Sequence, residues 1–119
     1  MATDWSDSIV VCDLRDEPAL SEELANAGTK LAAAKDEGKS PNVVLNFAEV
    51  TYLNSSNIAQ LLRLRKLAAE GRTKLKLAGM SDQVWSVMLL TGLDKVFEFA
   101  SDKATAIASL QIDAGASSR

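Results

Sequence analysis

The sequence predicts an α/β fold: a small mixed or mainly parallel sheet of about four strands, backed by about four helices, within one domain. Short apolar runs rich in branched residues alternate with longer segments whose apolar residues recur at helical spacing. The links between them are short, which is typical of parallel strands joined by crossover helices. The chain has 119 residues, of which 47% are hydrophobic, enough for a packed core. With so few elements, we expect helices on only one face of the sheet.

The first half of the chain predicts two strands separated by a long helix. Residues 8–14 form an apolar run that is typical of a strand. Pro18 opens a helix that extends to about residue 35, because its apolar residues keep helical spacing: Leu20, Leu24, Ala27 and Leu31. After a polar loop, the unbroken apolar run at residues 42–47 predicts a central strand.

The second half predicts five further elements: helix 56–70, strand 74–80, helix 83–91, strand 96–99 and helix 103–110. Gly71 and Gly92 lie where glycines commonly end helices. Ser81 lies where a side chain commonly caps a helix start. The small and polar tail at residues 111–119 is expected to fray.

Charge and composition exclude several classes of function. The net charge is −3 and the pI is near 4.9, so the chain would repel nucleic acid and anionic lipid. The apolar runs are too short to span a membrane. The acidic first residues lack the basic region of a signal peptide, so we expect a cytoplasmic location.

Catalysis and metal binding are also disfavoured. The chain has no histidine, the commonest general base and metal ligand, and no glycine-rich phosphate loop. Its single cysteine, Cys12, lies in a predicted strand and is interpreted as a structural thiol. We interpret five residues as solvated helix-start acids rather than a catalytic pair: Asp13, Asp16, Glu17, Glu22 and Glu23. We therefore expect a protein that is not an enzyme and carries no metal or cofactor.

The most informative stretch is Asn54-Ser55-Ser56-Asn57, which lies between the predicted central strand and the following helix. A serine at a helix start is exposed, and the backbone N–H groups there favour negative charge, which suits a phosphate. Serine and asparagine are equally the residues that cap a helix N-terminus. A phosphorylated serine and an ordinary cap therefore both remain open.

The helix that follows the serines offers a candidate surface for a protein partner. A helical wheel groups Ile58, Leu61, Leu62 and Ala68 on one side. Leu64 and Leu67 fall outside this group and would form an exposed apolar strip beside the serines, or else pack on a neighbouring helix. Arg65 falls within the apolar sector, and Trp85 is expected to pack in the core or at its edge.

Four segments, in their order and spacing, resemble the STAS domain, the family of anti-sigma factor antagonists and sulphate-transporter tails. They are residues 43–53, 54–58, 75–80 and 84–99, and the match spans about residues 9–110. Asn54-Ser55-Ser56-Asn57-Ile58 takes the place of the family's Asp-Ser-[Ser/Thr]-Gly-Leu, with asparagine in place of both the acid and the glycine. The family's strand before Ile9 looks missing or shortened.

The resemblance implies a signalling protein that works by binding another protein. It implies that Ser55 is phosphorylated by a partner kinase that is also an anti-sigma factor, which would make the chain a regulator of transcription. The alternative is a non-phosphorylated binding subunit, either of a signalling scaffold or of a membrane transporter's cytoplasmic ATPase. Asn54 and Asn57 favour the alternative, because the Asn54 amide lacks the carboxylate's charge and a side chain at Asn57 would crowd the backbone near the serine. The retained serine pair favours the antagonist.

Overall fold

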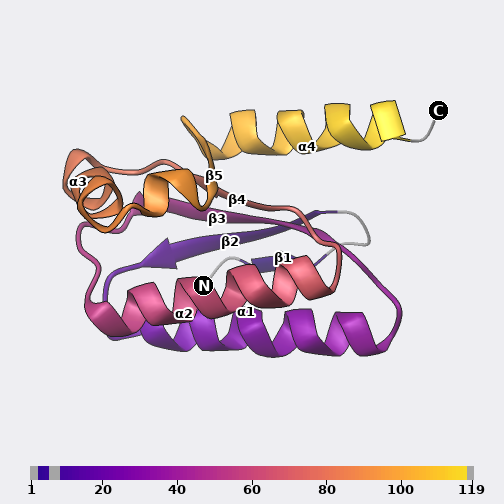
Figure 1. Ribbon diagram of the computed structural model, residues 1–119, viewed down its shortest axis with the longest axis horizontal. Coiled ribbons are helices and arrows are strands. Elements are labelled where there is room, and N and C mark those ends of the chain that lie inside the picture. The colour runs from indigo at the N-terminus through magenta and orange to yellow at the C-terminus, as the bar shows by residue number, and fades with distance from the viewer. Residues whose placement is uncertain (1–2, 6–8, 118–119) are drawn as a thin grey trace.

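The computed structural model describes residues 3–5 and 9–117, with side chains over residues 9–111. Its strands form one sheet in the order β1-β2-β3-β4-β5 (Figure 1). Strands β2 to β5 pair in parallel, and β1 pairs antiparallel with β2. The strands are β1 Thr3–Trp5, β2 Ile9–Arg15, β3 Asn42–Glu49, β4 Leu75–Ala78 and β5 Glu98–Ala100. The predicted mainly parallel sheet is confirmed, and the strand before Ile9 is shortened rather than missing.

The helices form layers on both faces of this sheet. Their bounds are α1 Ala19–Asp36, α2 Ser55–Glu70, α3 Asp82–Thr91, the 3-10 turn η1 Leu93–Lys95 and α4 Lys103–Ser117. Figure 1 shows α1 and α2 side by side against one face, α4 along the opposite face, and α3 at the end of the sheet where α2 begins. The expectation that helices cover only one face is therefore wrong.

Strand β3 explains the second helical layer, because its side chains are buried on both faces. Val43, Leu45 and Phe47 belong to the cluster that α1 and α2 cover. Val44 points the other way and packs with Ala106 and Leu110 of α4. A parallel strand with buried apolar side chains on both faces needs cover on both sides, and α4 supplies the second cover at Val44.

The helix ends follow the predicted signals with one exception. Ser81 caps α3, since its hydroxyl accepts a hydrogen bond from the Val84 backbone N–H at 3.2 Å. Gly92 ends α3 in the left-handed conformation, with φ of 76°. Gly71 ends α2 with φ of −87°, and the left-handed residue is Arg72, with φ of 58°. The turn after α2 thus places its unfavourable φ angle one residue later than the sequence suggests.

The last two elements also differ from the prediction. Strand β5 occupies Glu98–Ala100 rather than residues 96–99, because the backbone N–H groups of Val96 and Phe97 still bond to the Leu93 carbonyl of η1. Helix α4 continues to Ser117, past the predicted helix end at residue 110. The expected fraying of the tail stays a prediction. Alanines in the tail favour a helix. Within the described helices, none is both long and apolar enough to span a membrane.

The two-sided sheet predicts that Leu110→Ala destabilises the fold even though α4 lies outside the main core. Leu110 is fully buried, so the substitution should lower the free energy of unfolding by about 2–4 kcal/mol. Chemical denaturation would measure it. Leu90→Ala is the matched control, because Leu90 is 87% exposed and its loss should cost less than about 0.5 kcal/mol. Equal effects of the two substitutions would contradict the packing of α4 on the sheet.

Candidate functional site at the start of helix α2

The start of α2 lies at the sheet edge where the parallel strands β2 and β3 end. The loop before α1 and the loop before α2 meet at this edge. The Asp16 carboxylate accepts hydrogen bonds from the Thr51 backbone N–H at 2.9 Å and from the Thr51 hydroxyl at 2.7 Å. The backbone hydrogen bond from Thr51 is the main reason that the pKa of Asp16 lies below its usual value. The two loops are therefore joined by a carboxylate that stays ionised at neutral pH.

Asn54 and Asn57 cap α2 through a reciprocal pair of hydrogen bonds. The Asn54 Oδ1 accepts from the Asn57 backbone N–H at 2.8 Å, and the Asn57 Oδ1 accepts from the Asn54 backbone N–H at 3.0 Å. This is a capping box in which both side chains are amides. The predicted cap is thus confirmed at Asn54. Ser55 becomes the first helical residue, and both Ser55 and Ser56 are exposed.

Asn57 also joins α2 to the start of α1. Its side chain is fully buried, and its Nδ2 points to the Glu17 Oε2 at 3.3 Å, the Ser21 Oγ at 3.4 Å and the Gln60 Oε1 at 3.4 Å. Gln60 in turn donates to the Ser21 carbonyl at 2.9 Å. Asn57 therefore turns inward and does not crowd the backbone beside the serine. This network was not predicted from the sequence. The one signal that could have indicated it is the presence of polar residues at inward-facing positions of both helices.

The expected apolar strip of Leu64 and Leu67 is wrong for Leu64, which is only 2% exposed. Leu67 is half-buried, and a Cβ atom added at Gly28 of α1 would lie 3.7 Å from a Leu64 methyl and 3.8 Å from a Leu67 methyl. The two leucines thus pack on the neighbouring helix, which was the alternative. The buried stripe of α2 consists of Asn57, Leu61, Leu64 and Ala68. The wheel missed it because the stripe begins at a polar residue.

Two side chains that the wheel placed in the apolar sector are exposed instead. Leu62 is 42% exposed, although the sequence predicted it to be buried. Arg65 is exposed as well, and its Nε donates to the Val96 carbonyl at 3.2 Å. Arg65 therefore contacts backbone near η1 and not a carboxylate.

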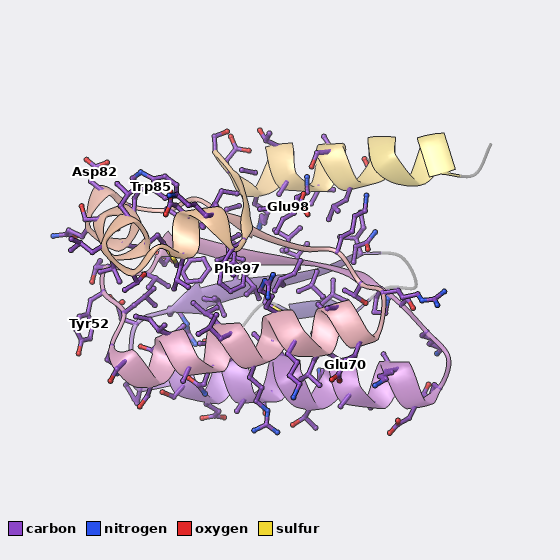
Figure 2. All side chains as sticks on the ribbon, in the orientation of Figure 1. Tyr52, Glu70, Asp82, Trp85, Phe97 and Glu98 are labelled. Atoms are coloured by element: carbon purple, nitrogen blue, oxygen red, sulfur yellow. The ribbon has the colours of Figure 1, made fainter. Side chains whose placement is uncertain are left out.

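Two large aromatic side chains lie at the same end of the molecule as the start of α2. Tyr52, in the loop before the cap, is 58% exposed. Figure 2 shows Tyr52 and Trp85 at this end. The Trp85 ring is 36% exposed and packs edge-to-face against Phe99, with centroids 5.0 Å apart, so Trp85 lies at the edge of the core as expected. Tyr52 has most of its surface free for contact with another molecule.

The acids near α1 do not share one environment. Asp13 accepts hydrogen bonds from Asn46 at 2.8 Å and from the Lys103 ammonium at 3.2 Å. Glu23 contradicts the interpretation as a solvated acid, because it is only 6% exposed. Burial raises the pKa of Glu23, and the charge of Arg15, whose Nε lies 3.8 Å from the carboxylate, opposes that rise. Among residues 9–111, no three or more Asp, Glu or Cys side chains are grouped so that they could hold a metal ion.

The profile of the STAS domain family matches residues 17–106, which is most of the chain. The chain belongs to the STAS domain family. The matched range includes the loop before α2, the amide capping box and both serines. No curated protein matches the sequence.

Solved structures of STAS proteins share the fold. A STAS domain protein of Planctomyces limnophilus, described as an anti-sigma-factor antagonist, aligns with a TM-score of 0.72 at 20% identity, over 92% of this chain and 97% of the other. RsbS of Moorella thermoacetica with a serine-to-glutamate substitution aligns with a TM-score of 0.76 at 15% identity, over 95% and 96%. Phosphorylated SpoIIAA of Bacillus aligns with a TM-score of 0.66 at 18% identity, over 92% and 97%. At these identities the likeness establishes the fold.

The amide cap of this STAS domain predicts different outcomes for two substitutions of Asn54. Asn54→Ala removes the acceptor for the Asn57 N–H and should lower the free energy of unfolding by about 1 kcal/mol. Asn54→Asp keeps an acceptor and should change it by less than about 0.5 kcal/mol. Chemical denaturation of both variants beside the wild-type protein provides the measurement. An equally large loss in Asn54→Asp would show that the amide donor, and not the cap acceptor, stabilises the helix start.

The buried Glu23 predicts a pH-dependent gain from Glu23→Gln. A carboxyl whose pKa is raised by folding stabilises the fold below its unfolded pKa, and this contribution is lost as the pH rises through the folded pKa. At pH 7 the ionised, buried carboxylate therefore lowers the free energy of unfolding, and Glu23→Gln should raise the melting temperature. The gain should vanish below about pH 4, where the unfolded carboxyl is also protonated. Melts of Glu23→Gln and of the exposed control Glu22→Gln across this range test it; a pH-independent difference would contradict burial as the cause.

Proposed function

We propose that this STAS domain is a protein-binding regulator of the anti-sigma factor antagonist type, switched by phosphorylation of Ser55. The observation that carries the proposal is the exposed Ser55 hydroxyl at the first position of α2, directly after its cap. A neighbouring residue caps the helix, so the hydroxyl is not needed for that role. The proposal includes a cytoplasmic location, because the partner kinase and the sigma factor that it controls act there.

A phosphate at Ser55 is compatible with the fold. It would add about −1.5 to −2 charges at pH 7 beside the N-terminus of α2, where the helix dipole favours negative charge. In the transfer, the Ser55 oxygen attacks the γ-phosphorus of a nucleoside triphosphate held by the kinase, and the bond to the diphosphate breaks. The hydroxyl proton passes to a base of the kinase, since this chain has no histidine to accept it. The surface at this end changes its charge while the core is untouched.

Exposed apolar side chains near the serine provide contact area for the partner. Tyr52 precedes the cap and is 58% exposed, and Leu62 lies two turns along α2 and is 42% exposed. Tyrosine is enriched at protein interfaces because it combines a large apolar ring with a hydroxyl. In the proposed partner surface, Tyr52 and Leu62 take the role that the sequence assigned to Leu64. The half-buried Leu67 lines the groove between α1 and α2.

The second candidate is a non-phosphorylated STAS binding subunit, either in a signalling scaffold or on a transporter's cytoplasmic ATPase. One observation favours it: Asn54 and Asn57 hold each other and the start of α1 in one arrangement without any charge of their own. A kinase that requires a carboxylate next to the serine would not find it at Asn54. In this case Ser55 and Ser56 would only begin the helix.

Ser55→Asp should distinguish the two candidates. In the switch, a fixed negative charge at position 55 weakens binding to the anti-sigma factor kinase at least about tenfold, a loss of about 1.4 kcal/mol. Isothermal titration against the purified partner gives the dissociation constant, and thermal melts show whether the fold is retained. Ser55→Ala should bind like the wild-type protein, because it adds no charge.

Ser56→Asp is the matched control for position, since Ser56 is the exposed neighbour on the same helix turn. Incubation with the kinase and ATP, followed by mass spectrometry, should locate the phosphate on Ser55. Equal affinities of the wild-type protein and Ser55→Asp, together with no phosphoserine after incubation, would replace the switch by the constitutive binding subunit.

A further inference from the structure

Glu17 places a carboxylate beside the start of α2, although it lies in the loop before α1. Its Oε1 accepts a hydrogen bond from the Ser21 backbone N–H at 2.7 Å. Its Oε2 accepts from the Ser21 hydroxyl and from the Asn57 Nδ2, the latter at 3.3 Å. These contacts direct the carboxylate toward the α2 capping box.

The surroundings of Glu17 keep it ionised at neutral pH. The hydrogen bonds from the Ser21 hydroxyl and backbone N–H are the main causes that lower the pKa of Glu17, and the side chains of Asn57 and Asn54 contribute further. The side chain itself is exposed. A full negative charge therefore lies 3.3 Å from the Asn57 amide, inside the capping box whose other member, Asn54, directly precedes Ser55.

We propose that Glu17 is the acidic group of the Ser55 switch, delivering from the β2–α1 loop the negative charge that Asn54 lacks. A second negative charge on Ser55 repels the Glu17 carboxylate and weakens its hydrogen bond to the Asn57 amide. Asn57 is the residue that connects the start of α2 to α1. Phosphorylation thereby changes the contacts of the β2–α1 loop as well as the charge at the serine. This inference rests on the proposed phosphorylation of Ser55.

The rest of the site allows Glu17 to respond while the frame stays in place. Thr51 remains bound to Asp16, and Asn57 remains bound to Asn54 through backbone N–H groups. The Glu17–Asn57 contact, at 3.3 Å, is longer than the hydrogen bonds that hold this frame, and its Glu17 end is exposed to solvent. A charge at Ser55 therefore alters this contact first.

A double-mutant cycle on the isolated domain tests the inference without any partner. Urea denaturation of the wild-type protein, Glu17→Gln, Ser55→Asp and the double variant gives the effect of Ser55→Asp with and without the Glu17 charge. We expect Ser55→Asp to be more harmful when Glu17 is present, by about three- to tenfold in the unfolding equilibrium constant at low salt. High salt should reduce this difference, because the repulsion occurs at the surface.

Glu22→Gln provides the matched control cycle. Glu22 carries the same charge on the first turn of α1, but it borders a surface pocket with Arg15 and Pro18. Its coupling to Ser55→Asp should be smaller than that of Glu17. A coupling for Glu17 that is absent, insensitive to salt or equal to that of Glu22 would overturn the inference.

The side-chain amide of Asn57 provides a direct spectroscopic readout. Its Nδ2 resonances in a ¹⁵N–¹H spectrum should shift on Ser55→Asp in the wild-type background, and much less in the Glu17→Gln background. Equal shifts in both backgrounds would overturn the inference. A clear coupling combined with unchanged partner binding of Ser55→Asp would overturn the proposed function and leave the Glu17–Ser55 coupling in place.

Discussion

Strand β3 carries fully buried apolar side chains on both faces, and this constraint arranges the other elements. Val43, Leu45 and Phe47 are buried against α1 and α2 on one face, and Val44 is buried against α4 on the other. Its neighbours β2 and β4 pair along both of its edges. Gly79, at the end of β4, has φ of +73°, and a Cβ atom there would lie only 2.9 Å from the Asn46 Oδ1 and 3.2 Å from the Ala48 nitrogen. Close approach at the ends of β3 and β4 thus requires glycine.

The same arrangement gathers polar groups where the parallel strands end. Backbone N–H groups in the loops there have no strand partner and bond to side chains instead. Asp16 binds the Thr51 backbone and Asn54 binds the Asn57 backbone, both on the side of α1 and α2. On the side of α4, Asp13 forms an ion pair with Lys103. The serines therefore rest on a fixed polar frame, and a change of charge at Ser55 acts on this frame rather than on the apolar core.

The sequence predicts features that depend on local chemistry better than features that depend on neighbours. The central strand, the Ser81 cap and the left-handed Gly92 follow from residue type and spacing, and the structure confirms them. The burial of Leu64 and Asn57 depends on where α1 lies across α2. A helical wheel contains no such information, and it grouped only apolar residues, which left out Asn57.

The contact between the loop before α1 and the start of α2 could not be predicted, for a related reason. Glu17 and Asn57 are 40 residues apart in the sequence, and only the packing of α1 beside α2 brings them within 3.3 Å. The serine segment itself could be found, because capping residues at a strand-to-helix junction are a local pattern. Its supporting residues Ser21 and Gln60 could not, since each is an ordinary polar residue of a helix when considered alone.

In the proposed switch, the capping of α2 and the charge that couples to Ser55 belong to different residues on different elements. A motif aspartate would perform both roles, so that repulsion from a phosphate would act on the helix cap itself. Asn54 is neutral, and its bond to the Asn57 N–H does not change with pH or with a charge on the serine. Glu17 carries the charge on the β2–α1 loop, where it can move away without uncapping the helix. The separation keeps the helix start folded in both states of the proposed switch and directs the electrostatic response toward α1.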